Sequence, residues 1–382
     1  MKVLVVGCGN IGSVAAEDLA KNMTPAVDVT VADRDEKRAE AVAQKVNTSN
    51  IDSVRLDVSD NVRLMKDLGR CDVVMGFLPG TLGYRLMQAC IEAQRDMVDV
   101  SYMAENPMSL NEKAVEAGIT IIPDCGLAPG ISNLLVGHTV KELDTIHLVR
   151  MMVGGLPEKP VPPLEYVVTW SPESLIDEYT RKARIIIKGK MAEVEALTGT
   201  ESVDFPNVGK LEAFFTDGLR TLMYTVEADE MWEKTLRYPG HADKIRLLQA
   251  LGFFDEKKID IDGLTLSPRR LAAKLLGKTL SKPEIRDFVA LKVVVSGVKD
   301  GLKKRQEYLM LDRYDKERHV TAMARTTAYP ASIAAQLLLK GEVSEEGVIP
   351  PEKLGMDDRI FKMFLGELKN RRIEITKQSS TL

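Results

Sequence analysis

The feature that most constrains the fold of this chain is a glycine-rich turn close to its first residue. An apolar run, Val3–Val6, leads directly into the sequence GCGNIG at residues 7–12, and apolar residues with helical spacing follow from Ile11 to Leu19. In this pattern the first glycine permits a tight turn, the second lets a pyrophosphate approach, and the third lets the helix pack on the strand. Because strand, turn and helix occur in order, the motif predicts a dinucleotide site at the helix N-terminus.

An acidic residue supports this interpretation. Asp33 ends the second predicted strand, residues 27–32, where a carboxylate accepts hydrogen bonds from a ribose 2′-hydroxyl and repels a 2′-phosphate. The sequence therefore favours NAD, with NADP less favoured, although Arg34 stands beside the ribose position and an arginine binds phosphate well. The alternative interpretation is a structural turn followed by a solvated aspartate.

Loops at the carboxyl ends of the predicted strands complete the expected cofactor site. Asp57 and Val58 are placed to border the adenine, or they mark only the end of a strand. Phe77 to Pro79 follow a buried strand where the cofactor is expected to cross the sheet. The predicted cofactor-binding residues are Gly7, Gly9, Asn10, Ile11, Gly12, Asp33, Arg34, Asp57, Val58, Phe77, Leu78, Pro79, Ser101 and Cys125.

The order of predicted elements indicates an α/β protein with a second domain inserted into the first. Strands and helices alternate up to about residue 130, which predicts a Rossmann fold with a doubly wound parallel sheet. Beyond it, hairpins expected at Gly189-Lys190 and Asp300-Gly301 predict an α+β domain. Helix Thr326–Leu339 is too apolar to stand exposed, so we expect it to return to the first domain. The predicted division is a nucleotide-binding domain at 1–130 plus about 323–345, a substrate-binding and dimerisation domain at 131–322, and a C-terminal tail at 346–382.

Composition excludes several classes of protein. The 382 residues are 45% hydrophobic and 28% charged with a net charge of −4, so no basic excess predicts binding to nucleic acid or an anionic membrane. No apolar run approaches the roughly 20 residues of a membrane span. The four cysteines are scattered without a CxxC pair, which predicts reduced thiols in a cytoplasmic protein. No spacing of histidine, cysteine and carboxylate residues predicts a metal site.

Several segments in order along the chain resemble saccharopine reductase and its relatives in the saccharopine dehydrogenase-like family. They include GFLPG at 76–80, CGLAPG at 125–130, GGLP at 154–157, TWSP at 169–172 and MARTTAYP at 323–330. Within that family, DMVDVSYMAENP at 96–107, TDGLR at 216–220 and RYPGH at 237–241 are more similar to L-lysine 6-dehydrogenase. Ala128 and Val153 stand where saccharopine reductase has an aspartate and a cysteine, which departs from the saccharopine-binding pattern.

The resemblance implies NAD-dependent oxidative deamination of the ε-amino group of L-lysine. Ammonia is released, and the product is allysine, which cyclises to 1-piperideine-6-carboxylate. Two alternatives remain open: a saccharopine reductase-like reaction that forms or oxidises a secondary amine, and an NAD-binding regulatory protein without turnover. A homodimer formed through the sheet of the second domain is expected by family analogy.

The proposed chemistry needs a carboxylate anchor and a group that takes a proton. Arg220 follows Asp217-Gly218 in an expected loop, and an arginine binds a carboxylate with two parallel hydrogen bonds; the alternative is a surface ion pair. The predicted substrate-binding residues are Arg220, Asp217, Trp170 and Tyr102. The ε-amine arrives protonated, since its pKa in water is about 10.4, so a base is required. The candidate catalytic residues are His241, Asp99 and Tyr102.

Overall fold

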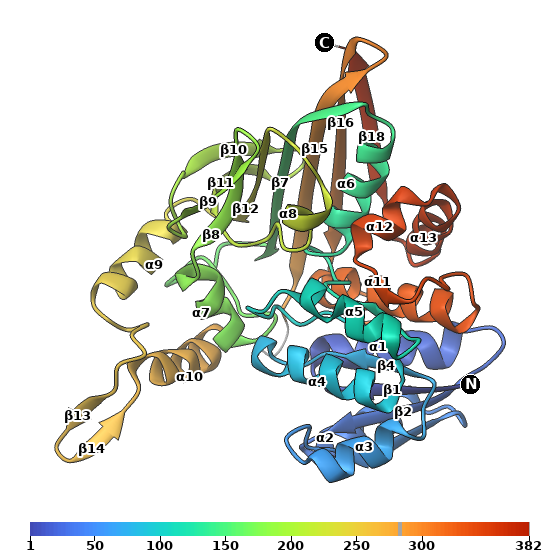
Figure 1. Ribbon diagram of the computed structural model, residues 1–382. Helices are drawn as coiled ribbons and strands as arrows, with labels where there is room; N and C mark the ends of the chain where they lie inside the picture. The colour runs from blue at the N-terminus through green and yellow to red at the C-terminus, as the bar shows by residue number, and fades with distance from the viewer. Residues whose placement is uncertain (282–284, 382) are drawn as a thin grey trace. The chain divides into compact units, whose positions relative to one another are not determined.

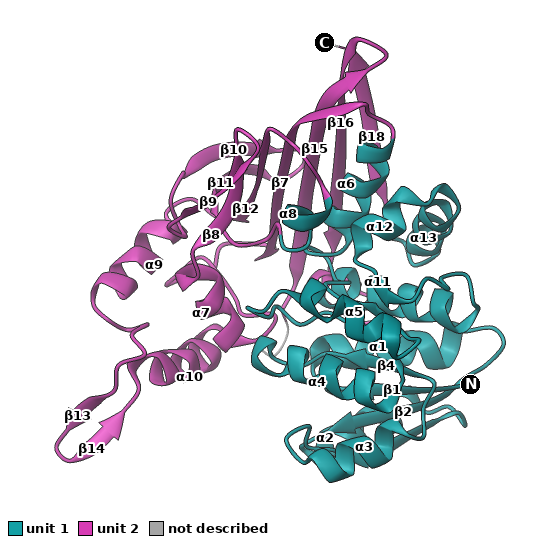
Figure 2. Cartoon of the chain, in the orientation of Figure 1, with its two compact units in different colours: residues 1–141, 220–225, 324–373 teal, residues 142–219, 226–323, 374–382 magenta. Residues whose placement is uncertain are grey.

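The computed structural model describes residues 1–281 and 285–381, which form two compact units (Figures 1 and 2). Unit 1 consists of residues 1–141, 220–225 and 324–373, and unit 2 of residues 142–219, 226–323 and 374–382. Within the described ranges, no helix is both long and apolar enough to cross a membrane.

Unit 1 is built on a seven-stranded parallel sheet with the strand order β17-β6-β5-β4-β1-β2-β3. Its strands are β1 (Lys2–Val6), β2 (Asp28–Asp33), β3 (Ile51–Arg55), β4 (Val73–Gly76), β5 (Asp96–Asp99), β6 (Thr120–Ile122) and β17 (Gly347–Val348). β1 and β4 are neighbours, and the chain runs outward from them in both directions. This order confirms the predicted doubly wound Rossmann sheet and places its switch point between β1 and β4.

Helices flank this sheet, as the burial of both its faces requires (Figure 1). The helices of unit 1 are α1 (Asn10–Asn22), α2 (Glu36–Val46), α3 (Asn61–Leu68), α4 (Gly80–Ala93), η1 (Pro107–Leu110), α5 (Asn111–Glu116), α6 (Ile131–Lys141), α8 (Leu222–Thr225), α11 (Ala322–Leu339), α12 (Pro351–Met356) and α13 (Asp358–Asn370), of which α6, α8, α12 and α13 pack on one another. A buried polar contact joins α1, α11 and the end of α13, because Asp18 accepts hydrogen bonds from Ser332 and Arg371.

Unit 2 contains a nine-stranded mixed sheet. Its strands are β7 (Thr145–Pro157), β8 (Ala183–Ile187), β9 (Lys190–Val194), β10 (Glu201–Phe205), β11 (Gly209–Phe215), β12 (Glu230–Arg237), β15 (Asp287–Lys299), β16 (Leu302–Arg313) and β18 (Ile375–Thr381). The hairpins β8–β9 and β15–β16 confirm the two predicted from their turn residues. Asp300 and Gly301 have φ angles of 50° and 75°, the left-handed values that a tight two-residue turn requires.

Three helices and a separate hairpin complete unit 2: α7 (Pro172–Thr180), α9 (His241–Ala250), α10 (Pro268–Leu280), and the pair β13 (Ile259–Ile261) and β14 (Leu264–Leu266). A hydrophobic cluster takes residues from all three helices, including Ile176, Ile245 and Ala273.

The two units differ in extent from the predicted domains. Unit 1 continues through α6 to Lys141, and it takes in the short segment 220–225 from the middle of the inserted region. Residues expected to form a tail supply β17 beside β6, and β18 beside β16. The two-residue strand β17 is too short for its alternation to be read from a sequence, so only its pairing identifies it.

Candidate cofactor and active site

The glycine turn of unit 1 has the geometry of a dinucleotide site. Gly7 has a φ of 105°, and a Cβ on Gly12 would lie 1.9 Å from the Gly7 carbonyl oxygen, so both positions need glycine. Gly9, in contrast, has no atom within 4 Å of where its Cβ would be, and it is exposed. No side chain caps α1 at Gly9, which leaves the first amides of the helix available to an anion. These residues fit a pyrophosphate.

Asp33 lies at the carboxyl end of β2, next to this turn. Its Oδ2 accepts a hydrogen bond from the Cys8 amide at 2.9 Å, and its Oδ1 accepts one from the Asp35 amide at 2.9 Å. The carboxylate is therefore held at the glycine turn but remains partly exposed, as recognition of a ribose diol requires. Arg34 beside it is exposed.

The two residues predicted to border the adenine, Asp57 and Val58, follow β3. Asp57 is exposed and accepts hydrogen bonds from the amide and hydroxyl of Ser59, and these bonds hold the pKa of Asp57 below its usual value. The side chain of Val58 packs into the core of unit 1. Asp57 thus caps a turn, and its neighbour contributes to the core, as expected for the end of a strand.

Across the switch point, the segment after β4 lies against the glycine turn. The Phe77 amide donates to the Val6 carbonyl at 2.8 Å. The Cβ of Phe77 lies 3.3 Å from the place that a Cβ on Gly12 would take. Ser101 and Cys125 follow β5 and β6, so both stand at the carboxyl edge of the sheet. Burial raises the pKa of the Cys125 thiol well above its usual value, which keeps it a neutral, inert thiol.

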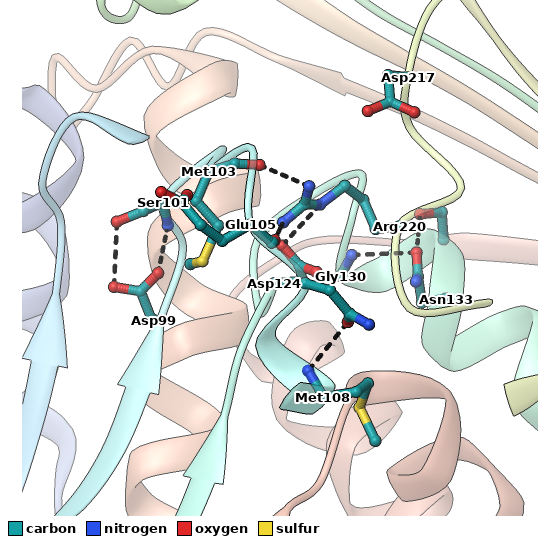
Figure 3. A network of polar contacts seen from close by, with 12 residues as sticks. Asp99, Ser101, Met103, Glu105, Met108, Asp124, Gly130, Asn133, Asp217 and Arg220 are labelled. Atoms are coloured by element: carbon teal, nitrogen blue, oxygen red, sulfur yellow. Dashed lines mark hydrogen bonds and ion pairs between the residues drawn. The ribbon is translucent and has the colours of Figure 1, made fainter. Parts of the chain in front are cut away.

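At this edge, Asp99, Ser101, Asp124 and Arg220 form a buried group that we call the polar cluster (Figure 3). Asp99 accepts hydrogen bonds from the Ser101 amide at 2.7 Å and from the Ser101 hydroxyl at 3.1 Å. Burial raises the pKa of Asp99 to about 7, against the opposing effect of these bonds. A carboxyl group in this state is suited to exchange protons near neutral pH.

Arg220 joins two loops of unit 1, the one after β5 and the one after β6, and we call this set of contacts the Arg220 clamp. Its Nε lies 3.3 Å from Oδ1 of Asp124, its Nη1 donates to the Met103 carbonyl at 2.6 Å, and its Nη2 points to the Glu105 carbonyl at 3.5 Å. The side chains of Arg220 and Asp124 are 1% and 0% exposed, and both residues have a φ of 53°. Non-glycine residues with left-handed backbones cluster at functional sites, because surrounding contacts must hold them there.

In this arrangement Arg220, the predicted carboxylate anchor, is engaged within unit 1. Its guanidinium contacts oxygens of the chain itself and is almost completely buried, so a substrate carboxylate would have to replace some of these contacts. The partly exposed Tyr102 ring centre lies 5.8 Å from the same guanidinium. Of the predicted substrate and catalytic residues, Asp99, Tyr102 and Arg220 thus come together in unit 1.

A second buried contact holds the segment that carries Arg220. The Thr225 hydroxyl donates to Oε1 of Glu352 at 2.6 Å, and the Asn133 side-chain amide donates to Oε2 of Glu352 at 3.2 Å. Burial raises the pKa of Glu352. Helices α8, α6 and α12 are therefore joined through one carboxyl group.

The remaining predicted site residues belong to unit 2 and do not form one group. Asp217 is fully buried and accepts two hydrogen bonds from the Arg184 guanidinium, at 2.9 and 2.7 Å, and one from the Arg184 backbone amide at 3.2 Å. Trp170 packs against the hydrophobic cluster of α7, α9 and α10, and its Nε1 donates to the Tyr166 hydroxyl at 3.3 Å. Both side chains have structural partners within unit 2.

His241, one of the three candidate bases, lies in the core of unit 2. The residue is 1% exposed; its Nδ1 lies 2.7 Å from the Leu164 carbonyl, and its Nε2 lies 2.8 Å from the Tyr179 hydroxyl. Burial, together with the positive charge of Arg237, lowers the pKa of His241 to about 3. Burial therefore favours the neutral imidazole, and both of its nitrogens are engaged with partners of unit 2.

Sequence reasoning missed Asp124 and Glu352. Asp124 lies two residues beyond the end of the buried strand β6, as Ser101 lies two residues beyond β5, so its place at the carboxyl edge could have been read from the sequence. Glu352 lies in the region predicted as a tail, and no local pattern distinguishes it from a surface glutamate.

Comparison with known proteins agrees with this architecture. Residues 3–122 match the family model of the saccharopine dehydrogenase NADP binding domain, and residues 126–373 match that of the saccharopine dehydrogenase C-terminal domain. A solved structure of apo saccharopine dehydrogenase (L-Glu forming) from Saccharomyces cerevisiae is similar in fold, with a TM-score of 0.80, 22% identity and 99% coverage of both chains.

Curated relatives match along most of the chain. Saccharopine dehydrogenase [NADP(+), L-glutamate-forming] of Saccharomyces cerevisiae is 26% identical, with 97% of each chain covered. Carboxyaminopropylagmatine dehydrogenase of Synechocystis is 24% identical, with 96% of each covered. Alpha-aminoadipic semialdehyde synthase of Arabidopsis thaliana is 29% identical over 73% of this chain, which spans only 29% of that longer relative. Because both family models match in order along the chain, it belongs to the saccharopine dehydrogenase family of pyridine-nucleotide oxidoreductases.

Proposed function

We propose that this protein is an NAD-dependent dehydrogenase that removes the ε-amino group of L-lysine. The observation that carries the proposal is Asp99, a buried carboxyl group with a pKa of about 7 at the edge of the sheet where nicotinamide is expected. An amine arrives as a cation, and a cation resists loss of hydride from the adjacent carbon. A group that accepts a proton near neutral pH is therefore a requirement of this chemistry.

The proton would pass to Asp99 through Ser101. The Ser101 hydroxyl donates to Oδ2 of Asp99, so its oxygen can accept a proton from the substrate ammonium as its own proton moves to the carboxylate. Asp99 itself is fully buried and makes no direct approach to solvent. Tyr102, partly exposed and adjacent in sequence, is the second candidate for contact with the amine.

The balanced reaction converts lysine, NAD⁺ and water into allysine, ammonium, NADH and one proton. When bound, the oxidised nicotinamide takes the hydride from the carbon that bears the amine. Hydrolysis of the resulting imine breaks the carbon–nitrogen bond and releases ammonia. The aldehyde then condenses with the α-amine of the same molecule, losing water, to give the six-membered 1-piperideine-6-carboxylate.

Asp33 supports NAD as the cofactor. A fixed carboxylate beside the glycine turn would bond the ribose hydroxyls and repel a 2′-phosphate. NADP is the alternative, since Arg34 is exposed at the next position and the matching family model is named for NADP.

The second candidate function is oxidation or formation of a secondary amine. It is favoured by the names of the relatives, which include saccharopine dehydrogenase and carboxyaminopropylagmatine dehydrogenase. Ala128 argues against saccharopine itself, because it stands where the saccharopine reductases have an aspartate. A regulatory protein that binds NAD without turnover is the third candidate.

Measurement of NADH formation with a panel of amines separates the three. We expect absorbance of the reduced nicotinamide to rise with lysine and NAD, and ammonia to appear in equal amount. Reduction of NAD by saccharopine but not lysine would establish the second candidate. Binding of NAD in a calorimeter with no turnover of any amine would establish the third.

A further inference from the structure

Two buried glycines of unit 1 lie directly against the Asp99–Ser101 pair of the polar cluster. Gly76 is the last residue of β4, and it pairs with Asp99 in the parallel register between β4 and β5. Gly83 lies near the start of α4. Neither glycine has a positive φ, so the need for room, and not an unusual backbone conformation, accounts for them.

The Asp99 carboxyl takes the room that a side chain at position 76 would need. A Cβ on Gly76 would lie 2.1 Å from Oδ2 of Asp99 and 3.2 Å from its Cγ. Non-bonded heavy atoms prefer separations above about 3 Å, so any side chain here would displace the carboxyl group. Glycine weakens the interior of a strand and often marks a place where another group approaches closely.

Ser101 approaches α4 in the same way. A Cβ on Gly83 would lie 2.5 Å from the Cβ of Ser101 and 2.7 Å from its Oγ. This hydroxyl is the one that donates to Oδ2 of Asp99 at 3.1 Å (Figure 3). Glycine is less favourable than alanine inside a helix, so the close approach of Ser101 gives position 83 a reason to be glycine.

The two contacts act on one hydrogen bond. Oδ2 of Asp99 lies beside Gly76 and accepts the Ser101 hydroxyl, and that hydroxyl lies beside Gly83. A methyl group on either glycine would push one end of the bond away from the other. Misplacing a reacting group by about 1 Å costs a reaction on the order of 100-fold in rate.

We propose that Gly76 and Gly83 are positioning residues, which hold the Asp99 carboxyl and the Ser101 hydroxyl at hydrogen-bond distance for transfer of a proton from the substrate amine. The inference rests on the proposed function, because it assigns this pair to proton transfer. The Ser101 oxygen takes the proton of the substrate ammonium while the Ser101 proton moves to Oδ2. Both glycines act only through the pair.

The other ionisable groups that face Asp99 do not titrate in its range. Arg220 of the polar cluster lowers the pKa of Asp99, whereas Asp124 raises it. The thiols of Cys90 on α4 and Cys125 after β6 also face Asp99, and burial raises the pKa of each well above its usual value. The hydrogen bonds from Ser101 lower the pKa of Asp99, so their loss should raise it.

Kinetics of Gly83→Ala test the proposal, with the amine that the substrate panel identifies. The added methyl group should push Ser101 from α4 and lower kcat/KM near neutral pH about 100-fold, mainly through kcat. The acid limb of the pH profile, where kcat/KM falls as Asp99 is protonated, should move to higher pH. Binding of NAD in a calorimeter should change little.

A second substitution shows whether the methyl group acts through Ser101. Ser101→Gly removes both atoms that the methyl group would strike, at the cost of the hydroxyl. In that background Gly83→Ala should lower neither the midpoint of urea unfolding nor kcat/KM any further. Gly76→Ala, with and without Asp99→Ala, repeats the design on the strand.

Two glycines elsewhere in the chain provide matched controls. Gly297, in β15 of unit 2, is equally crowded, because its Cβ would lie 2.0 Å from the Thr145 carbonyl oxygen. Gly297→Ala should lower the unfolding midpoint without moving the acid limb. Gly366, in α13, has no atom within 4 Å of its Cβ position, so Gly366→Ala should change neither property.

Three results overturn the proposal. The first is a Gly83→Ala protein with the kcat/KM and pH profile of the parent. The second is a loss of kcat/KM that is equally large with and without Ser101→Gly, since the methyl group would then act elsewhere. If Gly83→Ala fails to fold, Gly83→Ala/Ser101→Gly should fold, and an unfolded double variant is the third.

Failure of the proposed function gives a different result. If no amine in the panel reduces NAD, the proton transfer is refuted, and infrared titration of the Asp99 carboxyl decides whether the glycines position it, with Asp99→Asn as the reference. The pKa of Asp99, about 7 in the parent, should still be higher in Gly83→Ala. An unchanged pKa would overturn the positioning role itself.

Discussion

Replacing Arg220 by methionine would separate its role as a clamp from a role in binding substrate. In the structure the guanidinium contacts Asp124 and the carbonyls of Met103 and Glu105, all within unit 1. Methionine fills a similar volume without charge or hydrogen-bond donors. The variant therefore leaves the Asp124 carboxylate in a buried site without its guanidinium.

The expected loss of stability follows from these contacts. Removing one partner of a buried ion pair costs about 3–5 kcal/mol, most of it from the remaining buried charge. Adding Asp124→Asn removes that charge, so the double variant should recover most of the loss. It would still lack the bonds to the two carbonyls, worth about 1 kcal/mol each.

The assay combines urea unfolding with steady-state kinetics. If the guanidinium holds the two loops together, Arg220→Met should lower the urea concentration at the unfolding midpoint, and the double variant should recover it. The Michaelis constant of the double variant for lysine should then lie within a few-fold of the parent value. Arg371→Met, with and without Asp18→Asn, is the matched control. It breaks another buried Arg–Asp pair of unit 1, outside the polar cluster, and should change stability alone.

Two results would refute the reasoning. One is an Arg220→Met protein as stable as the parent, which would show that the guanidinium does not clamp the loops. The other is a double variant that recovers its stability but keeps a strongly raised Michaelis constant for lysine. The increase expected is the factor that corresponds to about 2–5 kcal/mol of binding free energy, the cost when a buried carboxylate loses its partner. That outcome would restore Arg220 as the anchor of the lysine carboxylate.

Four further predictions concern the cofactor, proton transfer and the pH dependence of stability. Asp33→Ala should lower kcat/KM for NAD and raise that for NADP relative to it, since the charge that repels a 2′-phosphate is lost. An unchanged ratio of the two kcat/KM values would contradict this. Because the pKa of Asp99 is about 7, kcat/KM should fall as pH drops below 7. Asp99→Asn should abolish this acid limb of the pH profile, along with most turnover. His241→Gln should leave the acid limb of the kcat/KM profile in place. A variant with a shifted pH profile would contradict this prediction. Because the pKa of His241 is lowered to about 3, the parent should lose stability in urea as pH falls from about 6.5 towards 3, and the variant should lose less.

The Rossmann sheet and the cofactor turn could be predicted because their signals are local. Continuous apolar runs identify buried parallel strands, and Gly7 and Gly12 are required by contacts within the turn itself. Asp33 is placed by the end of the strand that carries it. In each case the residues that specify the structure are neighbours in sequence.

The sequence alone determined the parallel sheet, its glycine turn and the acidic residue beside it. The reason is that backbone geometry and the alternation of strands and helices along the chain follow from short-range pattern. Only the tertiary structure decided what the polar side chains do. Arg220 reaches Asp124, 96 residues away, and Glu352 reaches Thr225, 127 residues away, while His241 is enclosed by partners from other elements. Burial sets the pKa of Asp99 and of His241 in opposite directions, and burial depends on which distant segments cover a residue.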